Sequence, residues 1–198
     1  MSGQTLTQAQ KAYRIGDPDG EYAIFDPTGS RLFPGRWNTP ASPMIYASAD
    51  YSTSMLEKLV HGSGRLPPNQ HYVEILLSAG LSYEVLSQPA VPGWDHPDCN
   101  ASRTFGETWH RSRRSLLLFV PSVVARVSTN ILINPDHPDF GRITVGLHQP
   151  CWWDNRLFER PGNPTSAPTA SSRPVQSAGP HDALSAIGEF GDGPNLDP

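Results

Sequence analysis

The chain has 198 residues, of which 37% are hydrophobic and 17% charged, and its formal net charge is −4. This length suits one domain plus an additional segment, and the mild negative charge gives no support to direct binding of nucleic acid. The 21 prolines and 17 glycines exclude a helix bundle and favour short strands joined by many turns.

The cysteines and the apolar runs indicate where in the cell the protein is expected and which covalent or metal links it is expected to lack. Cys99 and Cys151 lie far apart, so we expect neither a disulfide framework nor a zinc site, and no other metal site is predicted. Residues 1–10 are polar and lack the apolar core of a signal peptide. No apolar run approaches the ~20 residues needed to cross a bilayer. We therefore expect a cytoplasmic protein that does not contact a membrane.

Short strands are expected along much of the chain, in segments that are rich in β-branched and large apolar residues and are bounded by turn formers. The expected strands are residues 12–15, 44–48, 71–77, 81–86, 115–120 and 130–134, with an extended continuation at 123–127. Between the first two of these, residues 29–43 are predicted to form a loop.

Two helices are predicted. Residues 52–61 carry an apolar stripe at helical spacing, and Asp50 or Ser52 is expected to cap the start while Gly62 ends the helix. The stripe consists of Met55, Leu56, Leu59 and Val60. A shorter helix is expected over 106–113. Because helices and strands are interspersed without a regular βαβ alternation, we predict an α+β fold.

The composition changes after Phe158. Residues 161–198 are dominated by Pro, Ser, Thr, Ala, Gly and Asn, so they cannot bury enough apolar area to offset the entropy cost of ordering. We predict one domain over residues 1–160, with its core at about 12–158, followed by a disordered tail over 161–198.

Two side chains in the first third of the chain are candidates for ligand binding. Arg36 lies in the glycine-containing loop 34–38, where a guanidinium can bind a phosphate through two hydrogen bonds; the alternative is a surface arginine stacked on Trp37. Tyr46 precedes two small residues at the end of a strand and offers an aromatic face to a flat ring. The alternative for Tyr46 is a core tyrosine whose hydroxyl is hydrogen-bonded.

Glu57 is the candidate for catalysis. It borders the apolar side of the 52–61 helix, where a carboxylate is costly unless it is paired or functional. A glutamate beside a glycosidic bond can stabilise an oxocarbenium-like transition state. The alternative is a solvated glutamate paired with Lys58 or Arg65. Ser122 follows a strand, but it lacks the Gly-x-Ser-x-Gly context of a serine hydrolase.

Several segments resemble, in order and spacing, the RES-domain family, named for its shared Arg, Glu and Ser. They are Tyr13-Arg14-Ile15, Gly35-Arg36-Trp37-Asn38, Ile45-Tyr46-Ala47-Ser48, Leu56-Glu57-Lys58-Leu59-Val60-His61, Phe105-Gly106-Glu107-Thr108-Trp109, Val120-Pro121-Ser122-Val123-Val124, the run 130–138, and Trp153-Asp154-Asn155-Arg156-Leu157-Phe158. The resemblance covers residues 12–158, and the tail has no counterpart in the family core.

The resemblance implies an ADP-ribosyltransferase-like fold, with small mixed or antiparallel β-sheets and flanking helices around an NAD cleft. It also implies a toxin of a type II toxin–antitoxin system that depletes NAD⁺ and arrests growth by cleaving the nicotinamide–ribose bond, through hydrolysis or phosphorolysis. NAD⁺ is then the substrate and no cofactor is implied. The implied partner is an Xre-like helix-turn-helix antitoxin, which contacts DNA in place of this chain.

The resemblance also assigns roles to residues. Arg36 would hold the NAD⁺ phosphates or ribose, Tyr46 would stack on the nicotinamide side, and Glu57 would stabilise the ribosyl cation. Ser122 would shape the pocket through hydrogen bonds, and Arg14 would be a second anion contact. Protein ADP-ribosylation, or a catalytically inactive partner of a DNA-binding antitoxin, are the alternatives to NAD⁺ breakdown.

Overall fold

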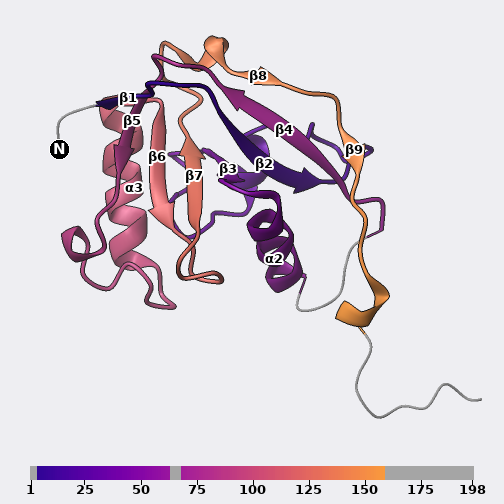
Figure 1. Ribbon diagram of the computed structural model, residues 1–198. Coiled ribbons are helices and arrows are strands. Elements are labelled where there is room, and N and C mark those ends of the chain that lie inside the picture. The colour runs from indigo at the N-terminus through magenta and orange to yellow at the C-terminus, as the bar shows by residue number, and fades with distance from the viewer. Residues whose placement is uncertain (1–3, 63–67, 159–198) are drawn as a thin grey trace, which may run out of the picture. The chain divides into compact units, whose positions relative to one another are not determined.

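The computed structural model describes residues 4–62 and 68–158 (Figure 1). The strands are β1 (Gln4–Thr5), β2 (Gln10–Gly16), β3 (Ile45–Ser48), β4 (His71–Leu77), β5 (Ser82–Val85), β6 (Leu117–Pro121), β7 (Thr129–Ile133), β8 (Thr144–Val145) and β9 (Gln149–Pro150). The α-helices are α1 (Thr28–Leu32), α2 (Tyr51–His61) and α3 (Asn100–Ser112), with 3₁₀ turns at Gln88–Ala90, Phe140–Arg142 and Asn155–Leu157. The predicted tail and the domain end at residue 160 lie outside the described residues.

The described strands form one connected mixed sheet in the order β1-β5-β6-β7-β3-β2-β4-β8, with β9 also paired to β4. All pairs are antiparallel except the parallel pair β5–β6. β2 and β4 pair along their whole lengths, from Gln10↔Leu77 to Gly16↔His71, whereas β2 meets β3 only at Tyr13↔Ser48. The expected α+β class with a mixed sheet is confirmed, and the sheet consists of two well-paired parts joined at one narrow seam.

The central strands β6 and β7 are buried on both faces. Leu117 and Ile133 belong to an apolar cluster on one face, while Leu118 and Leu132 belong to a second cluster on the other face. Successive side chains of a strand point to opposite faces, so a strand covered on both sides is a continuous apolar run instead of an alternating one. Each such buried side chain contributes about 1.5–3 kcal/mol of hydrophobic free energy.

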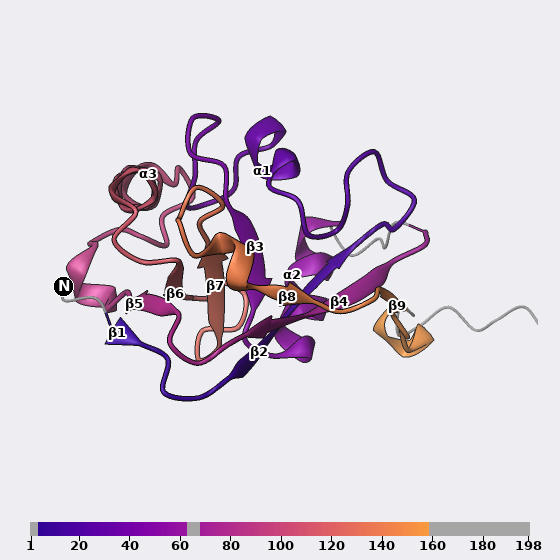
Figure 2. The same ribbon diagram turned by 90° about the horizontal axis from the view of Figure 1, so that it is seen from above.

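Helix α3 lies beside β5 and β6 and covers the second cluster (Figures 1 and 2). It begins at Asn100, six residues before the expected start at 106. A Cβ atom at Gly106 would lie 1.8 Å from the Trp37 carbonyl oxygen, so only glycine lets the helix approach this loop. Three residues later Trp109 is fully buried, and its indole N–H donates to Ser115 Oγ at 2.9 Å.

Two other expectations are wrong in detail. Residues 123–127 form a turn instead of a strand, because Ser122 Oγ accepts from the backbone N–H groups of Val124 (3.1 Å) and Ala125 (2.9 Å). The predicted loop at 29–43 includes most of the short helix α1. Across the described residues, no helix has both the length and the apolar character that crossing a membrane requires.

Helix α2 begins and ends as predicted, but only half of its expected apolar stripe is covered, since Met55 and Leu59 are half-buried. The Asp50 carboxylate accepts from Thr53 N and Thr53 Oγ1 at 2.8 and 2.7 Å, which caps the helix, and Gly62 is its C-cap. Leu56 and Val60 of the expected apolar stripe are 44% and 57% exposed, whereas the small polar side chains of Thr53 and Ser54 are buried. The helix therefore turns its polar side, with Glu57, toward the sheet.

Candidate active site

The Glu57 side chain reaches from α2 to the ends of β6 and β7. Its Oε1 atom accepts hydrogen bonds from Ser122 Oγ at 2.8 Å and from Asn130 Nδ2 at 2.6 Å. No described residue donates to Oε2, and no described Lys or Arg forms an ion pair with Glu57, so the predicted alternative of a pair with Lys58 is wrong. Arg65, the other predicted partner, lies outside the described residues. One oxygen is thus fixed by neutral donors, and no described cation is paired with the carboxylate.

Asn130 and Ser48 complete this network, and the sequence did not single out either of them. Ser48 Oγ donates to Asn130 Oδ1 at 2.8 Å, which leaves the Asn130 amide nitrogen directed to Glu57. Ser122 is fully buried, and its hydroxyl also accepts from the following turn. The only available signal was a polar residue near the start of an otherwise apolar strand at 130–134.

Tyr46 has the hydrogen-bonded hydroxyl of its core interpretation, while stacking on a ligand ring stays a prediction. Its hydroxyl donates to Asn38 Oδ1 at 2.8 Å and accepts from Trp37 N at 3.0 Å, and burial raises the pKa of this phenol. A Cβ atom at Gly35 would lie 2.8 Å from the Tyr46 ring, so the glycine allows the loop to cross the phenol end of the side chain. The ring itself lines the cleft described below.

Arg36 does not stack on Trp37, which is buried against Trp94 with the two rings nearly parallel and 6.0 Å apart. Instead, Arg36 Nη1 donates to the carbonyl oxygens of Trp94 (3.1 Å) and His96 (2.8 Å). These bonds orient the guanidinium, and no described residue accepts from its Nε or Nη2 atoms. Beside it, Arg103 Nε donates to the carbonyl of Gly35 at 3.1 Å.

Arg14 and Lys58 form a second basic group. Arg14 Nη1 donates to the Tyr46 carbonyl at 2.9 Å, across the seam between β2 and β3, and burial lowers the pKa of this guanidinium to about 10. Burial, followed by the positive charge of Arg14, lowers the pKa of Lys58. Among the described residues, neither side chain forms an ion pair.

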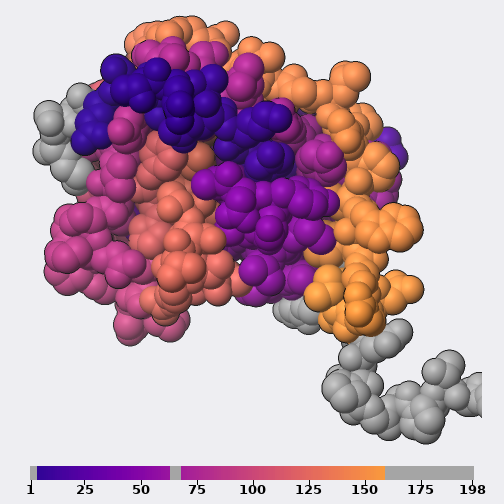
Figure 3. Space-filling model, viewed as in Figure 1, coloured from indigo at the N-terminus to yellow at the C-terminus, as the bar shows by residue number. Residues whose placement is uncertain are grey.

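These side chains surround a cleft of about 850 Å³. Arg14, Arg36, Tyr46 and Glu57, four of the candidate residues, line it together, and Ser122 lies behind Glu57. On the face drawn in Figure 3, the segment that contains α2 (purple) is at the surface, between the salmon segment of β6 and β7 and the orange residues that follow β7. The charged residues that line the cleft are four cations and one carboxylate, although the whole chain is acidic.

The charged residues of the lining are Arg14, Arg36, Lys58, Arg103 and Glu57. A cleft of this size with converging basic groups suits a phosphate-containing small molecule.

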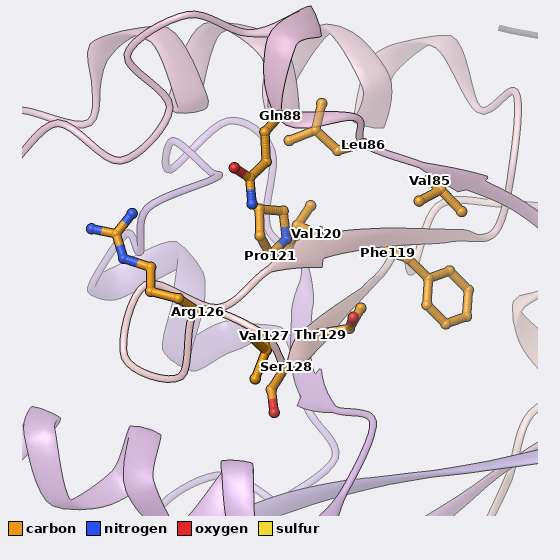
Figure 4. A pocket seen from close by; sticks show the side chains of 10 residues that line it. All are labelled: Val85, Leu86, Gln88, Phe119, Val120, Pro121, Arg126, Val127, Ser128 and Thr129. Atoms are coloured by element: carbon orange, nitrogen blue, oxygen red, sulfur yellow. The ribbon is translucent and has the colours of Figure 1, made fainter.

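A second hollow of about 170 Å³ lies at the ends of β5 and β6 (Figure 4). Its only charged side chain, Arg126, is directed away from Pro121 and bonds Asp95 at 2.8 Å. This hollow lacks the groups needed for catalysis. Within residues 4–62 and 68–158, no three His, Cys, Asp or Glu side chains gather in a way that could hold a metal ion.

Comparison with known protein families shows that residues 11–154 match the family described as the RES domain. The chain belongs to the RES family. The match contains every site residue described above and ends just before the last 3₁₀ turn of the described chain.

Two curated RES relatives are similar over most of their length. The "Prs ADP-ribosylating toxin" of Sphingobium sp. (strain YBL2) is 37% identical over 137 residues, which cover 67% of this chain and 85% of the relative. "Toxin Res" of Pseudomonas putida is 35% identical over 144 residues, covering 69% of this chain and 94% of the relative. The resemblance to the RES family that the sequence motifs indicated is thereby confirmed.

A solved structure has the same fold. A chain of the Mycobacterium tuberculosis MbcT–MbcA toxin–antitoxin complex superposes with a TM-score of 0.60 at 15% sequence identity, covering 74% of this chain and 86% of that chain. At this identity the likeness concerns the fold of the RES domain.

Proposed function

We propose that this RES protein is a toxin that cleaves the bond between nicotinamide and ribose in NAD⁺. The observation that carries the proposal is the Glu57 carboxylate, fixed through one oxygen by two neutral donors in a cleft whose other charged residues are basic. A carboxylate without a paired cation in the described part of the chain can face a ribosyl cation directly. The basic side chains supply the attraction that a dinucleotide diphosphate needs.

The proposed reaction moves positive charge from the nicotinamide ring to the ribose. The bond from ribose C1′ to the nicotinamide nitrogen breaks, nicotinamide leaves as a neutral ring with the electron pair, and positive charge develops on the ribosyl group. The carboxylate of Glu57 stabilises this charge. Water then forms a bond to C1′ and loses one proton, which gives ADP-ribose. Tyr46 offers its ring to the nicotinamide, and Arg36 and Arg103 hold the phosphates.

The toxin role and an antitoxin partner rest on the comparisons and on one surface feature. Two relatives are named toxins, and the structural neighbour comes from a toxin–antitoxin complex. Phe33 and Val60 line the cleft while remaining 81% and 57% exposed. Exposed apolar side chains at the mouth of a cleft favour a protein partner that covers the cleft, for which we propose an Xre-like antitoxin.

Transfer of ADP-ribose to a protein is the second candidate, favoured by the name of the Sphingobium relative. The bond that breaks is the same, and a protein side chain replaces water as the group that attacks C1′. Incubation with NAD⁺ labelled in the adenylate moiety and cell extract separates the two reactions. Free labelled ADP-ribose indicates hydrolysis, whereas a labelled protein band indicates transfer.

The test of the proposal is nicotinamide release from NAD⁺ by purified protein, comparing wild type, Glu57→Gln and Glu21→Gln. Glutamine keeps the volume of Glu57 but removes the charge, so turnover should fall roughly 10²–10³-fold, as when one stabilising group of a transition state is lost. Glu21 is an exposed carboxylate outside the cleft and serves as the matched control with wild-type turnover. Wild-type turnover by Glu57→Gln would overturn the role of this carboxylate.

A further inference from the structure

Two histidines from distant parts of the chain meet on the surface, outside the cleft. Nδ1 of His71 lies 2.9 Å from Nδ1 of His148, and the centroids of the two rings are 4.9 Å apart. His148 is exposed, His71 is half-buried, and neither lines the cleft. Within the described part of the chain, no residue bonds the Nε2 atom of either ring, so both imidazoles can rotate.

The backbone under this pair is held by strand pairing. His71 is the first residue of β4 and pairs with Pro150 of β9, and His148 comes two residues before Pro150. Side chains placed diagonally across such a ladder project on one face and can reach each other. Cys151 N also donates to the Gln70 carbonyl at 2.8 Å, and β9 lies beside β4 in Figure 1. The fold itself therefore brings the two imidazoles together.

The contact between the two imidazoles sets a condition on their protons. A hydrogen bond between two Nδ1 atoms requires a proton on one and a free lone pair on the other, so the pair shares a single proton. If both rings were protonated, two like charges would face each other at this distance. A metal ion in place of the shared proton can accept both lone pairs, since neutral imidazole is the commonest metal ligand in proteins.

The separation of the two nitrogens suits one class of metal ion. Imidazole nitrogens bind a divalent transition metal at about 2.0–2.1 Å, so two of them lie about 2.9 Å apart at a right angle and about 3.3 Å apart in a tetrahedron. The 2.9 Å between the Nδ1 atoms of His71 and His148 matches the right angle. Tetragonal coordination of this kind, by nitrogen and oxygen ligands, is typical of Ni²⁺ and Cu²⁺.

We propose that His71 and His148 chelate a divalent transition-metal ion of tetragonal preference, Ni²⁺ or Cu²⁺, with water as the remaining ligands. Asn69, two residues before His71, donates through Nδ2 to Asp17 Oδ1 at 2.9 Å and to Asp19 Oδ2 at 2.7 Å. Among the described residues these carboxylates complete no three-ligand set, so they act on the cation through their field. The site is separate from the cleavage of NAD⁺ and does not rest on it.

The first experiment titrates Ni²⁺ into the full chain, without a polyhistidine tag, by calorimetry. It compares wild type with His71→Gln, His148→Gln and the control His96→Gln, an exposed histidine that faces Asp98 at 3.2 Å. Loss of groups that only orient a metal ligand already weakens binding by roughly 10–100-fold, so each variant of the pair should lose at least as much. The control should bind as wild type does. Wild-type affinity in a His71→Gln protein that circular dichroism shows to be folded overturns the proposal.

Modification with diethyl pyrocarbonate locates the bound ion. The reagent acylates a free imidazole lone pair, and a ring that binds a metal through one nitrogen carries its proton on the other. Mass spectrometry should therefore show that Ni²⁺ protects the peptides that carry His71 and His148, while the peptide of His96 stays reactive. If Ni²⁺ protects neither peptide of the pair, the ion is bound elsewhere in the chain and the site is overturned.

Thermal unfolding tests whether the ion joins the two segments. An ion that bridges His71 and His148 binds the folded chain, so the melting temperature should rise with Ni²⁺ concentration in wild type and in His96→Gln. It should stay constant in His71→Gln and His148→Gln, and EDTA should reverse the rise. A wild-type melting temperature that does not respond to Ni²⁺ overturns the bridge.

Discussion

Two glutamates in this molecule occupy opposite electrostatic situations. Glu84 on β5 has a side chain that is 1% exposed; its two oxygens accept from Arg114 Nε and Nη2, both at 3.0 Å, and Ser115 Oγ lies 3.3 Å from Oε1. Glu57 is bound on one oxygen by neutral groups and opens to a basic cleft. The first carboxylate is paired with a guanidinium, and the second is bound only by neutral side chains of the described residues.

The surroundings of Glu84 explain why it suits a structural role. The guanidinium of Arg114 donates two parallel hydrogen bonds to the two oxygens of Glu84. Ser115 Oγ bonds Glu84 and also accepts from the buried indole N–H of Trp109. Nothing in this region opens to the cleft. Comparing the two glutamates therefore separates groups that hold the fold from groups that act on a substrate.

The largest expected effect, after the loss of turnover in Glu57→Gln, is on stability in Glu84→Gln. Arg114 is 41% exposed, so water partly replaces its lost carboxylate, and the free energy of unfolding should fall by about 1.5–3 kcal/mol, the contribution of a hydrogen bond to a charged group. Thermal unfolding should shift down by roughly 3–12 °C, as expected for a domain of this size. Glu57→Gln should shift by no more than about 2 °C. Equal shifts of the melting temperature in Glu84→Gln and Glu57→Gln would show that the two glutamates do not differ in their contribution to the fold.

A smaller effect is expected for Asn130→Ala, which keeps the Glu57 charge but removes one bond that positions it. Turnover should fall about tenfold, with the KM for NAD⁺ little changed, because a hydrogen bond to a carboxylate is worth about 1.5 kcal/mol. Steady-state kinetics of nicotinamide release measures the two parameters separately, and Asn155→Ala, at an exposed position outside the cleft, is the control. A rise in KM with unchanged kcat would show that Asn130 acts on binding instead.

The smallest expected effect is on the pH dependence of stability, through a histidine on α3 near Glu84. Burial lowers the pKa of His110, which lies beside Trp109 on α3, below its ordinary value of 6.5; the opposing influence of Asp136 is weaker. Below pH 6.5, His110 takes up a proton in the unfolded chain but not in the folded chain. The free energy of unfolding that this difference contributes is therefore complete above pH 6.5 and decreases as the pH falls.

Urea unfolding between pH 5 and 8 measures this dependence. His110→Gln should flatten the curve in the acidic part of the range. A curve with the same slope in wild type and variant would show that other groups, such as His137, whose pKa burial also lowers, account for the loss.

Much of the fold was predictable from local patterns, since the buried strands are apolar runs and Asp50 and Gly62 mark the ends of α2. The burial of α2 was not predictable: periodicity identifies an apolar face, but it cannot tell whether the chain covers that face or leaves it exposed, as at Leu56 and Val60. The turn after Ser122 depends on a hydroxyl bonding to backbone, which competes with strand extension.

In the site, the motifs identified Glu57, Tyr46 and Arg36 as neighbours of one cleft. Asn130 was missed because its contact with Glu57 spans 73 residues of sequence and depends on how β7 enters the sheet. Lys58 was considered only as an ion-pair partner of Glu57, because adjacency in sequence says nothing about direction: consecutive residues of a helix point about 100° apart.

The seam between β2 and β3 has a mechanical consequence. In most sheets, a force that separates neighbouring strands is shared by several paired residues. Between β2 and β3 it acts on the single pair Tyr13↔Ser48 and on the hydrogen bond from Arg14 to the Tyr46 carbonyl. Both lie at the cleft wall. Among the described strands, a change in cleft width would therefore load this single pair and would leave the β2–β4 and β3–β7 pairings intact.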